Sequence, residues 1–173
     1  MTVRIDLARS APRDIEAVGV PVGTEGTVPR SLGMSRARLA EAGFDGKIGQ
    51  VLVVPSGDGP THIAVGVGGH KDRTANGLRT AAAALARSLG KRTSVATSLA
   101  DLDGENAKAA AQAVVEGLVL GSYRYLDHKT DKPKPGLEHA VLLVGQAREN
   151  GVKSGAARGT VTAGAVTLAR DFA

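Results

Sequence analysis

The stretch ENAKAAAQAVVEGLVLGSYRYLDHKTDK, from Glu105 to Lys132, decides how the rest of this sequence is interpreted. Its first half carries apolar residues at spacings of four, three and four positions, namely Ala107, Ala111, Val114 and Leu118. That spacing predicts a helix with one buried face. After Gly121 the composition changes to an aromatic and charged run. The helix is therefore expected to end there, in a polar turn at the surface.

On both sides of this helix, apolar patterns of period two alternate with helical patterns. We predict strands at residues 3–7, 15–22, 48–55, 62–68, 93–97 and 138–145. Further helices are predicted at residues 35–42, 74–89 and 155–172. Strands that alternate with helices indicate an α/β fold, with a mixed sheet layered by helices. A chain of 173 residues suits a single domain.

Three details of the pattern give sharper expectations. The most continuously apolar runs, Val51–Val54, Ile63–Val67 and Val141–Val144, are expected at the centre of the sheet. Pro21 indicates a strand end or a sheet edge, because proline cannot donate a ladder hydrogen bond. In the last predicted helix an amphipathic stripe is formed by Val161, Ala165, Leu168 and Phe172.

The composition excludes several classes of protein. There are no cysteines, which removes disulfides, thiolate metal sites and cysteine nucleophiles. Aromatic residues make up only 2%, so the core must be aliphatic. Residues 1–10 do not resemble a secretory signal, and no run approaches the roughly 18 apolar residues needed to cross a bilayer. A soluble, cytoplasmic protein without a membrane partner is the simplest interpretation.

The formal net charge of +5 raises the hypothesis of nucleic-acid binding. However, the basic residues are dispersed, and only the turn from Lys129 to Lys134 is locally basic. We therefore expect nucleic acid to bind weakly and without sequence preference, if it binds at all.

A glycine-rich segment, GVGGHK at Gly66–Lys71, lies where a strand leads toward a helix, which is a common place for a phosphate-binding loop. The dinucleotide pattern G-x-G-x-x-G is incomplete, because Lys71 occupies the position of its last glycine. A structural role in a tight turn is the main interpretation of these glycines. Binding of a nucleotide is the alternative.

The remaining polar candidates show no catalytic spacing. The histidines lack any metal-ligand pattern; His62 and His139 open predicted strands, whereas His70 and His128 lie in loops. None of the loop serines Ser56, Ser98 and Ser122 lies in a G-x-S-x-G motif. Asp101 and Asp103 fit helix-entry caps better than an acid–base pair. Tyr123, Arg124 and Tyr125 have two interpretations. They stack on a base or contact a protein partner, or they simply pack within the domain and at its surface.

The residue order VEGLVLGSYRYLDHKTDK, residues 115–132, resembles the helix that closes the N-terminal domain of the leucyl aminopeptidases. These are a family of cytosolic two-metal exopeptidases. The likeness extends from about residue 51 to residue 173. VLVVPSGDGPTHIAVGVGG (51–69) resembles paired central strands of the family, and ALARSLGKRTSVATSL (84–99) the helix and strand that follow. GAVTLARDFA (164–173) resembles the helix that leads into the second domain. The first 45 residues match little.

This resemblance implies a macro-domain-like fold, with a mixed sheet sandwiched between helices and residues 1–173 forming the N-terminal domain. It implies a parent hexamer, in which two divalent ions, zinc or manganese, serve the catalytic domain. The family's metal-binding motif NTDAEGRL and its catalytic lysine and arginine have no counterpart here. We therefore assign no catalytic, cofactor-binding or metal-binding residue, and expect the chain to be inactive alone. Its final helix, near residues 155–173, is expected to lead into a catalytic domain and to have an exposed end that associates with other surfaces.

Three hypotheses about function follow. The first is a non-catalytic accessory domain of a leucyl aminopeptidase, partnered by its own catalytic domain and by other subunits. The second is a free-standing macro-like module that binds ADP-ribose or a similar nucleotide through Gly66–His70. The third is a non-specific nucleic-acid-binding domain.

Overall fold

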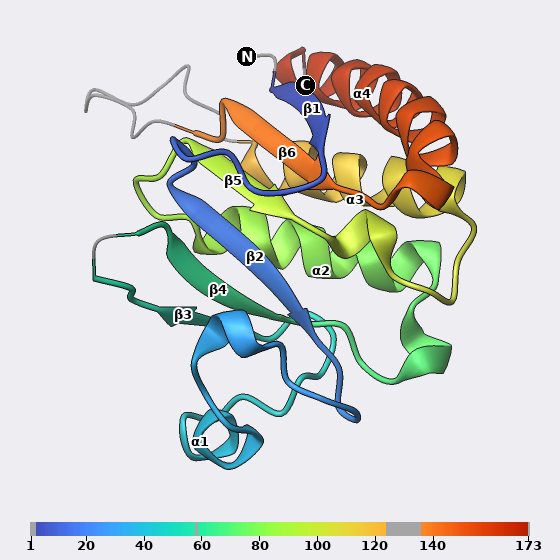
Figure 1. Ribbon diagram of the computed structural model, residues 1–173. Helices are drawn as coiled ribbons and strands as arrows, with labels where there is room; N and C mark the ends of the chain where they lie inside the picture. The colour runs from blue at the N-terminus through green and yellow to red at the C-terminus, as the bar shows by residue number, and fades with distance from the viewer. Residues whose placement is uncertain (1–2, 58, 124–135, 173) are drawn as a thin grey trace.

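The computed structural model describes residues 3–57, 59–123 and 136–172 (Figure 1). Within them, six strands form one sheet in the order β1-β6-β5-β2-β4-β3. The strands are β1 (Arg4–Ala8), β2 (Ala17–Val22), β3 (Val51–Val54), β4 (Thr61–Gly66), β5 (Ser94–Thr97) and β6 (His139–Leu143). All neighbouring pairs are parallel except β3 and β4, which form an antiparallel pair. The predicted mixed sheet is confirmed.

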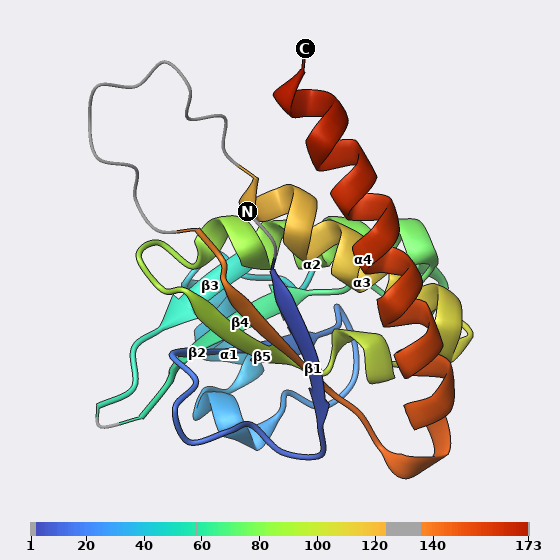
Figure 2. The same ribbon diagram turned by 90° about the horizontal axis from the view of Figure 1, so that it is seen from above.

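The helices lie unequally on the two faces of this sheet. They are α1 (Arg36–Glu41), α2 (Ala75–Ser88), α3 (Ala107–Ser122) and α4 (Glu149–Asp171). Figures 1 and 2 show α2 and α3 covering one face, with α4 packed alongside α3, whereas the short α1 lies on the opposite face. The four predicted helices are confirmed, and α4 begins earlier than the predicted residue 155. The likeness to macro domains stays a prediction.

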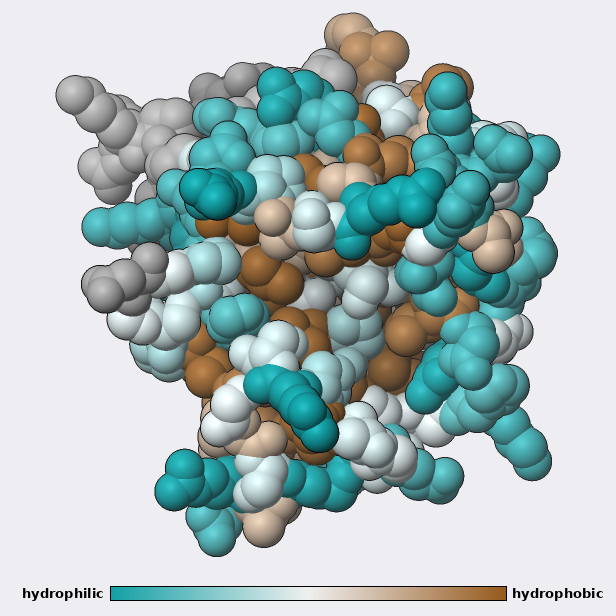
Figure 3. Space-filling model, viewed as in Figure 1, coloured by the Kyte–Doolittle hydropathy of each residue, from teal (hydrophilic) through white to brown (hydrophobic). Residues whose placement is uncertain are grey.

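The core is aliphatic, as the composition required. Its largest cluster lies between the sheet and the α2–α3 layer, and contains fully buried Ile63, Leu85 and Leu118. A smaller cluster on the other face joins β2 and β4 to Leu39 of α1 and to Phe44. Figure 3, which views this second face, shows hydrophobic side chains over the middle of the sheet, framed by polar ones.

The position of β3 contradicts one expectation. Val51–Val54 does not lie at the sheet centre but forms an edge strand, and Val53 is 40% exposed. The run is apolar because Val51 packs against the α2–α3 side and Leu52 against the α1 side. A strand whose two faces are both covered by other elements is apolar, even when it lies at the edge of the sheet and pairs on one side only. The other two runs fall mainly on the inner strands β4 and β6, as predicted.

Pro21 marks the end of β2, as predicted. The ladder between β2 and β5 stops at the pair Gly19–Thr97, whereas the ladder between β2 and β4 continues to Val22. Pro21 therefore lies beyond the last β2–β5 pair, and its missing N–H costs the sheet no hydrogen bond on that side.

Capping fixes the start and end of α2. The Thr74 hydroxyl accepts a hydrogen bond from the Gly77 N–H (3.2 Å), and the Glu105 carboxylate accepts one from the Ala75 N–H (3.2 Å). Both bonds satisfy donors that the first helical turn leaves unpaired. After the helix, Gly90 adopts φ of +67°, the left-handed conformation that favours glycine. Thr74 therefore caps the start of α2, and Gly90 follows its end.

Glu16 gives the fold a predictable dependence on pH. Its carboxylate accepts hydrogen bonds from the Thr93 N–H, the Ser94 N–H and the Thr93 hydroxyl, at the start of β5. The Thr93 N–H, the largest contributor, lowers the pKa of Glu16 below its ordinary value of 4.5. This stabilisation is complete above the ordinary pKa and is lost as the pH falls through the lowered value.

We therefore expect Glu16→Gln to lose less stability on acidification than the unsubstituted protein does. Urea unfolding on both sides of pH 4.5 measures this difference. Equal acid-induced losses in the two proteins would refute the role of Glu16.

Candidate functional site

Helix α3, which contains the helical half of the Glu105–Lys132 stretch, lies between α2 and α4. Glu116 on α3 has a side chain only 7% exposed, and it forms an ion pair with Arg79 of α2, with nitrogen–oxygen distances of 2.7 and 2.8 Å. Its second oxygen accepts a hydrogen bond from Gln112 at 2.8 Å. The carboxylate is thereby fully engaged between two helices.

Glycines on α3 permit the close approach of α2. A Cβ at Gly117 would overlap the Arg79 carbonyl oxygen, and one at Gly121 would lie 2.7 Å from the Cα of Ala83. Real side chains do not tolerate such distances, because interiors are close-packed. Glu116, Gly117 and Gly121 therefore serve helix packing.

Glycines on α4 likewise permit its close approach to α3. A Cβ at Gly151 would lie 2.7 Å from Ala107, one at Gly155 would overlap the Lys108 carbonyl oxygen, and one at Gly159 would lie 2.9 Å from Val115. The other buried residues of this face are Val152, Ala156 and Ala163. We call this face of α4 the glycine face.

The amphipathic stripe predicted for the last helix lies on the opposite side of α4. Val161 is 74% exposed, Leu168 58% and Phe172 84%. Residues four, three and four positions apart share one helical face, so Ala165 completes the series. Val161, Ala165 and Leu168 belong to the C-terminal part of α4, and Phe172 follows its last residue. Figure 2 shows this part of α4 extending past α2 and α3. We call these four residues the outer stripe.

Tyr123, at the end of α3, holds this part of α4 in place. Its hydroxyl donates a hydrogen bond to Asp171 (2.6 Å), and the Arg170 guanidinium lies 5.5 Å from the centre of its ring. The structure thus gives Tyr123 a packing role between helices. Arg124, Tyr125, His128 and the basic turn at Lys129–Lys134 lie outside the described residues.

A groove of about 170 Å³ runs beside the outer stripe. It is lined by Val3, Val119 of α3, and residues of α4 that include Gly164, Thr167 and Leu168. No neighbouring atom lies within 4 Å of the place where a Gly164 side chain would begin. The pattern of bulky residues revealed the stripe, but this groove had no signal in the sequence.

The Gly66–Lys71 segment does not form a phosphate-binding loop. The N–H groups of Gly66, Val67 and Gly68 donate to the carbonyl oxygens of Gln50, Val22 and Gly46. The Gly69 N–H donates to the Asp72 carboxylate at 2.8 Å. Phosphate binding requires free backbone donors, and these four are engaged within the protein. The structural interpretation of the glycines is favoured.

The two aspartates of the Asp101–Asp103 segment act separately and do not cap α3, whose cap is Asn106. Asp101 accepts a hydrogen bond from the Gly145 N–H (3.1 Å), which joins the loops after β5 and β6. Asp103 forms an ion pair with Arg73.

The histidines and serines also lie apart. His139 contacts Asp6 at 2.9 Å across β1 and β6, and exposed His70 lies 3.8 Å from Asp103. His62 is a half-buried residue of β4. Ser56 and Ser122 donate to carbonyl oxygens of their own loop or helix, and Ser98 precedes a short 3₁₀ turn at Leu99–Asp101. No nucleophile–base pair is formed among the described members of this set.

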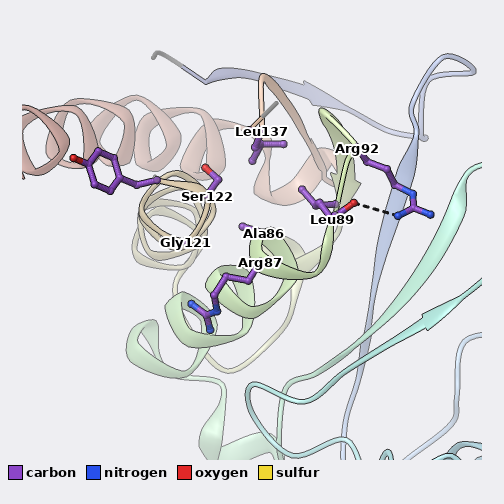
Figure 4. Close-up of a pocket in the computed structure, with 10 residues that line it drawn as sticks. Ala86, Arg87, Leu89, Arg92, Gly121, Ser122 and Leu137 are labelled. Atoms are coloured by element: carbon purple, nitrogen blue, oxygen red, sulfur yellow. Dashed lines mark hydrogen bonds between the residues drawn. The ribbon is translucent and has the colours of Figure 1, made fainter. Parts of the chain in front are cut away.

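A second cavity, of about 200 Å³, lies at the ends of α2 and α3 near the start of β6. Two arginines border it, but Figure 4 shows that their side chains point in different directions. Arg92 donates to the Leu89 carbonyl oxygen (3.1 Å), and Arg87 lies alongside α2 and points the other way. The two guanidinium groups do not converge on an anion site.

Metal binding and membrane insertion find no support in the described ranges. Over residues 3–57, 59–123 and 136–172, no three His, Asp or Glu side chains gather as metal ligands. The same ranges contain no helix that is both long and apolar enough to span a bilayer.

Comparisons with known proteins identify the family of this chain. A curated relative from Mycobacterium leprae, described as a probable cytosol aminopeptidase, is 36% identical over 96% of this chain and 32% of its own length. One from Corynebacterium diphtheriae with the same description is 29% identical over 99% of the chain and 36% of its own. The chain thus spans about a third of the length of these relatives.

Solved structures agree. The bottromycin maturation enzyme BotP, determined in complex with Mn, is 33% identical with a TM-score of 0.70, over 90% of this chain and 31% of that one. A tomato leucine aminopeptidase mutant shares the fold with a TM-score of 0.67 at 20% identity, over 88% of this chain and 35% of that one. The family model for the N-terminal domain of the cytosol aminopeptidase family matches residues 31–132. The chain therefore belongs to the cytosol aminopeptidase family, as a member of its N-terminal domain.

Proposed function

We propose that this chain is the non-catalytic accessory domain of a cytosolic two-metal aminopeptidase, which removes N-terminal residues from peptides. The observation that carries the proposal is the match of nearly the whole chain to about a third of the Mycobacterium leprae relative. The packing of α3 supports it, because Glu116, Gly117 and Tyr123 of the family-like motif are all engaged in contacts between helices.

The metal ions belong to the catalytic domain in this proposal. Bound ions of this kind activate water and polarise the scissile carbonyl. The described residues of this chain do not fit such a group, because no three potential ligands gather. Zinc and manganese are the candidate ions, and BotP is described in complex with Mn.

The domain's partners in this proposal are its own catalytic domain and the other subunits of a hexamer, in the cytosol. The relatives' descriptions as cytosol aminopeptidases support this location. The alternatives of ADP-ribose and nucleic-acid binding gain no support from the relatives reported above, and the engaged N–H groups of Gly66–Gly69 weigh against the first.

A chimera tests the proposed function. In it, residues 1–173 replace the matching third of the Mycobacterium leprae relative. With manganese or zinc and a leucyl anilide, we expect turnover by the chimera and by the intact relative, and none by the isolated 173-residue chain. Chelator-sensitive turnover by the isolated chain would overturn the proposal. An inactive chimera beside an active relative would also count against it.

A further inference from the structure

Helix α4 has two apolar faces, of which this domain uses one. Its glycine face packs on α3, and its outer stripe of Val161, Ala165, Leu168 and Phe172 faces the opposite way. Four large hydrophobic side chains are exposed in the described part of the chain, and three of them belong to this stripe. Single exposed apolar residues are ordinary, but a concentration on one face marks an interaction surface.

The groove beside the outer stripe adds a concave part to this surface. Leu168 belongs to both features, so that a partner covering the stripe also reaches the groove. Gly164 leaves one wall of the groove open. The surface therefore fits a partner that covers the apolar stripe along α4 and inserts a side chain into the groove, whose lining also includes polar Thr160, Thr167 and Asp171.

We infer that the outer stripe and the groove are the surface on which the catalytic domain of the same polypeptide packs. This inference rests on the proposed function. The family description is that of an N-terminal domain, so further chain follows it in family members. The matched third of the relatives leaves about two thirds of their length as candidate partner. The stripe lies on α4, the last described element, within direct reach of chain that follows it.

Surface area distinguishes this partner from a second copy of the chain. A specific, stable complex between separate proteins buries about 1,200 Å² or more. Three large side chains on one helical stripe are a small contribution to such an area. A covalently linked domain needs less, because the linkage raises its effective concentration to about the millimolar range. The stripe is therefore suited to a partner in the same chain.

The first experiment measures protection of the surface. The chain contains no cysteine, so Leu168→Cys places a single thiol on the stripe, and Thr162→Cys places one on an exposed position beside it. Each variant is treated with a thiol reagent as the isolated chain and within the chimera, and peptide mapping reads the labelled position. We expect labelling at position 168 to be at least about tenfold slower in the chimera, and labelling at position 162 to change little.

The second experiment measures the contribution of the contact. Leu168→Asp combined with Val161→Asp should leave the melting temperature of the isolated chain nearly unchanged, because both residues are exposed. The same double variant should lower the melting temperature of the chimera and its aminopeptidase activity. Thr162→Asp, which adds a charge beside the stripe, serves as the matched control and should change neither protein.

The outcomes separate this inference from the proposed function. An active chimera whose stripe is fully labelled and tolerates both aspartates would overturn the inference and leave the proposed function intact. A chimera that is inactive with the unsubstituted stripe would overturn both. If the isolated chain sediments as a dimer that the double variant converts to a monomer, the partner is a second copy and the inference is wrong.

Discussion

Replacing Gly155 with valine is expected to destabilise the protein by about 3 kcal/mol or more. A Cβ at this position would overlap the Lys108 carbonyl oxygen and lie 3.0 Å from the Cβ of Ala111. Both neighbours belong to the well-packed helix α3, so relief requires the two helices to separate. Because Val152, Ala156 and Ala163 lose their contacts with α3 at the same time, the damage extends along the glycine face. Urea unfolding followed by circular dichroism measures the loss.

Gly164 provides the matched control on the same helix. Nothing lies within 4 Å of its missing Cβ, so Gly164→Ala is expected to stabilise the protein by about 0.5–1 kcal/mol through its better helix propensity. Opposite signs for two glycine substitutions in one helix would establish that contact with α3, and not helix propensity, makes Gly155 necessary. A Gly155→Val protein as stable as the original would refute the packing described above.

Removing the Glu116 carboxylate is the second change with a large expected effect. Glu116→Ala leaves Arg79 and Gln112 without their partner between α2 and α3. Breaking a buried ion pair costs about 3–5 kcal/mol when the remaining charge stays buried. The Arg79 side chain is 37% exposed and can recover part of its hydration. We therefore expect a loss of about 2–3 kcal/mol, measured by urea unfolding at neutral pH.

The exposed pair formed by Asp45 and Lys47 is the control for this prediction. Its atoms are 3.2 Å apart, but both side chains are more than half exposed. Asp45→Ala should therefore cost no more than about 0.5 kcal/mol, because water screens such a pair. Equal losses from Glu116→Ala and Asp45→Ala would show that burial of Glu116 adds nothing to the stability of the helix pair.

The order of strands and helices could be predicted from the sequence, because caps and turns leave local signals. Thr74 precedes α2 and Gly90 follows it, and Ser35 caps α1 through the Arg38 N–H. The position of β3 could not be predicted in the same way. An apolar run reports that both faces of a strand are covered, whereas the place in the sheet depends on which neighbour pairs with its edge. Here β3 pairs only with β4, to which it is joined in a hairpin, and this pairing places β3 at the edge of the described sheet.

Of the two faces of α4, the sequence predicted the outer stripe but not the glycine face. The spacing of Val161, Leu168 and Phe172 revealed the outer stripe, because bulky apolar residues dominate any count of hydrophobic periodicity. The same count overlooks Gly151, Gly155 and Gly159, which have no side chain to contribute. The interface that holds α4 to the domain is therefore built from residues that a hydrophobic pattern cannot detect, and only the close approach to α3 identifies it.

The pairing of β1 with β6 sets the time at which the domain can finish folding. β1 has β6 as its only neighbour in the described sheet, and the paired residues Arg4 and His139 are 135 positions apart. A ribosome adding about 5–20 residues per second needs roughly 7–27 s to synthesise that interval. Throughout it the first strand made has no partner, whereas the β3–β4 hairpin can close at once. The nascent chain must therefore carry an unpaired strand, of which one face is apolar, until nearly the whole domain has been synthesised.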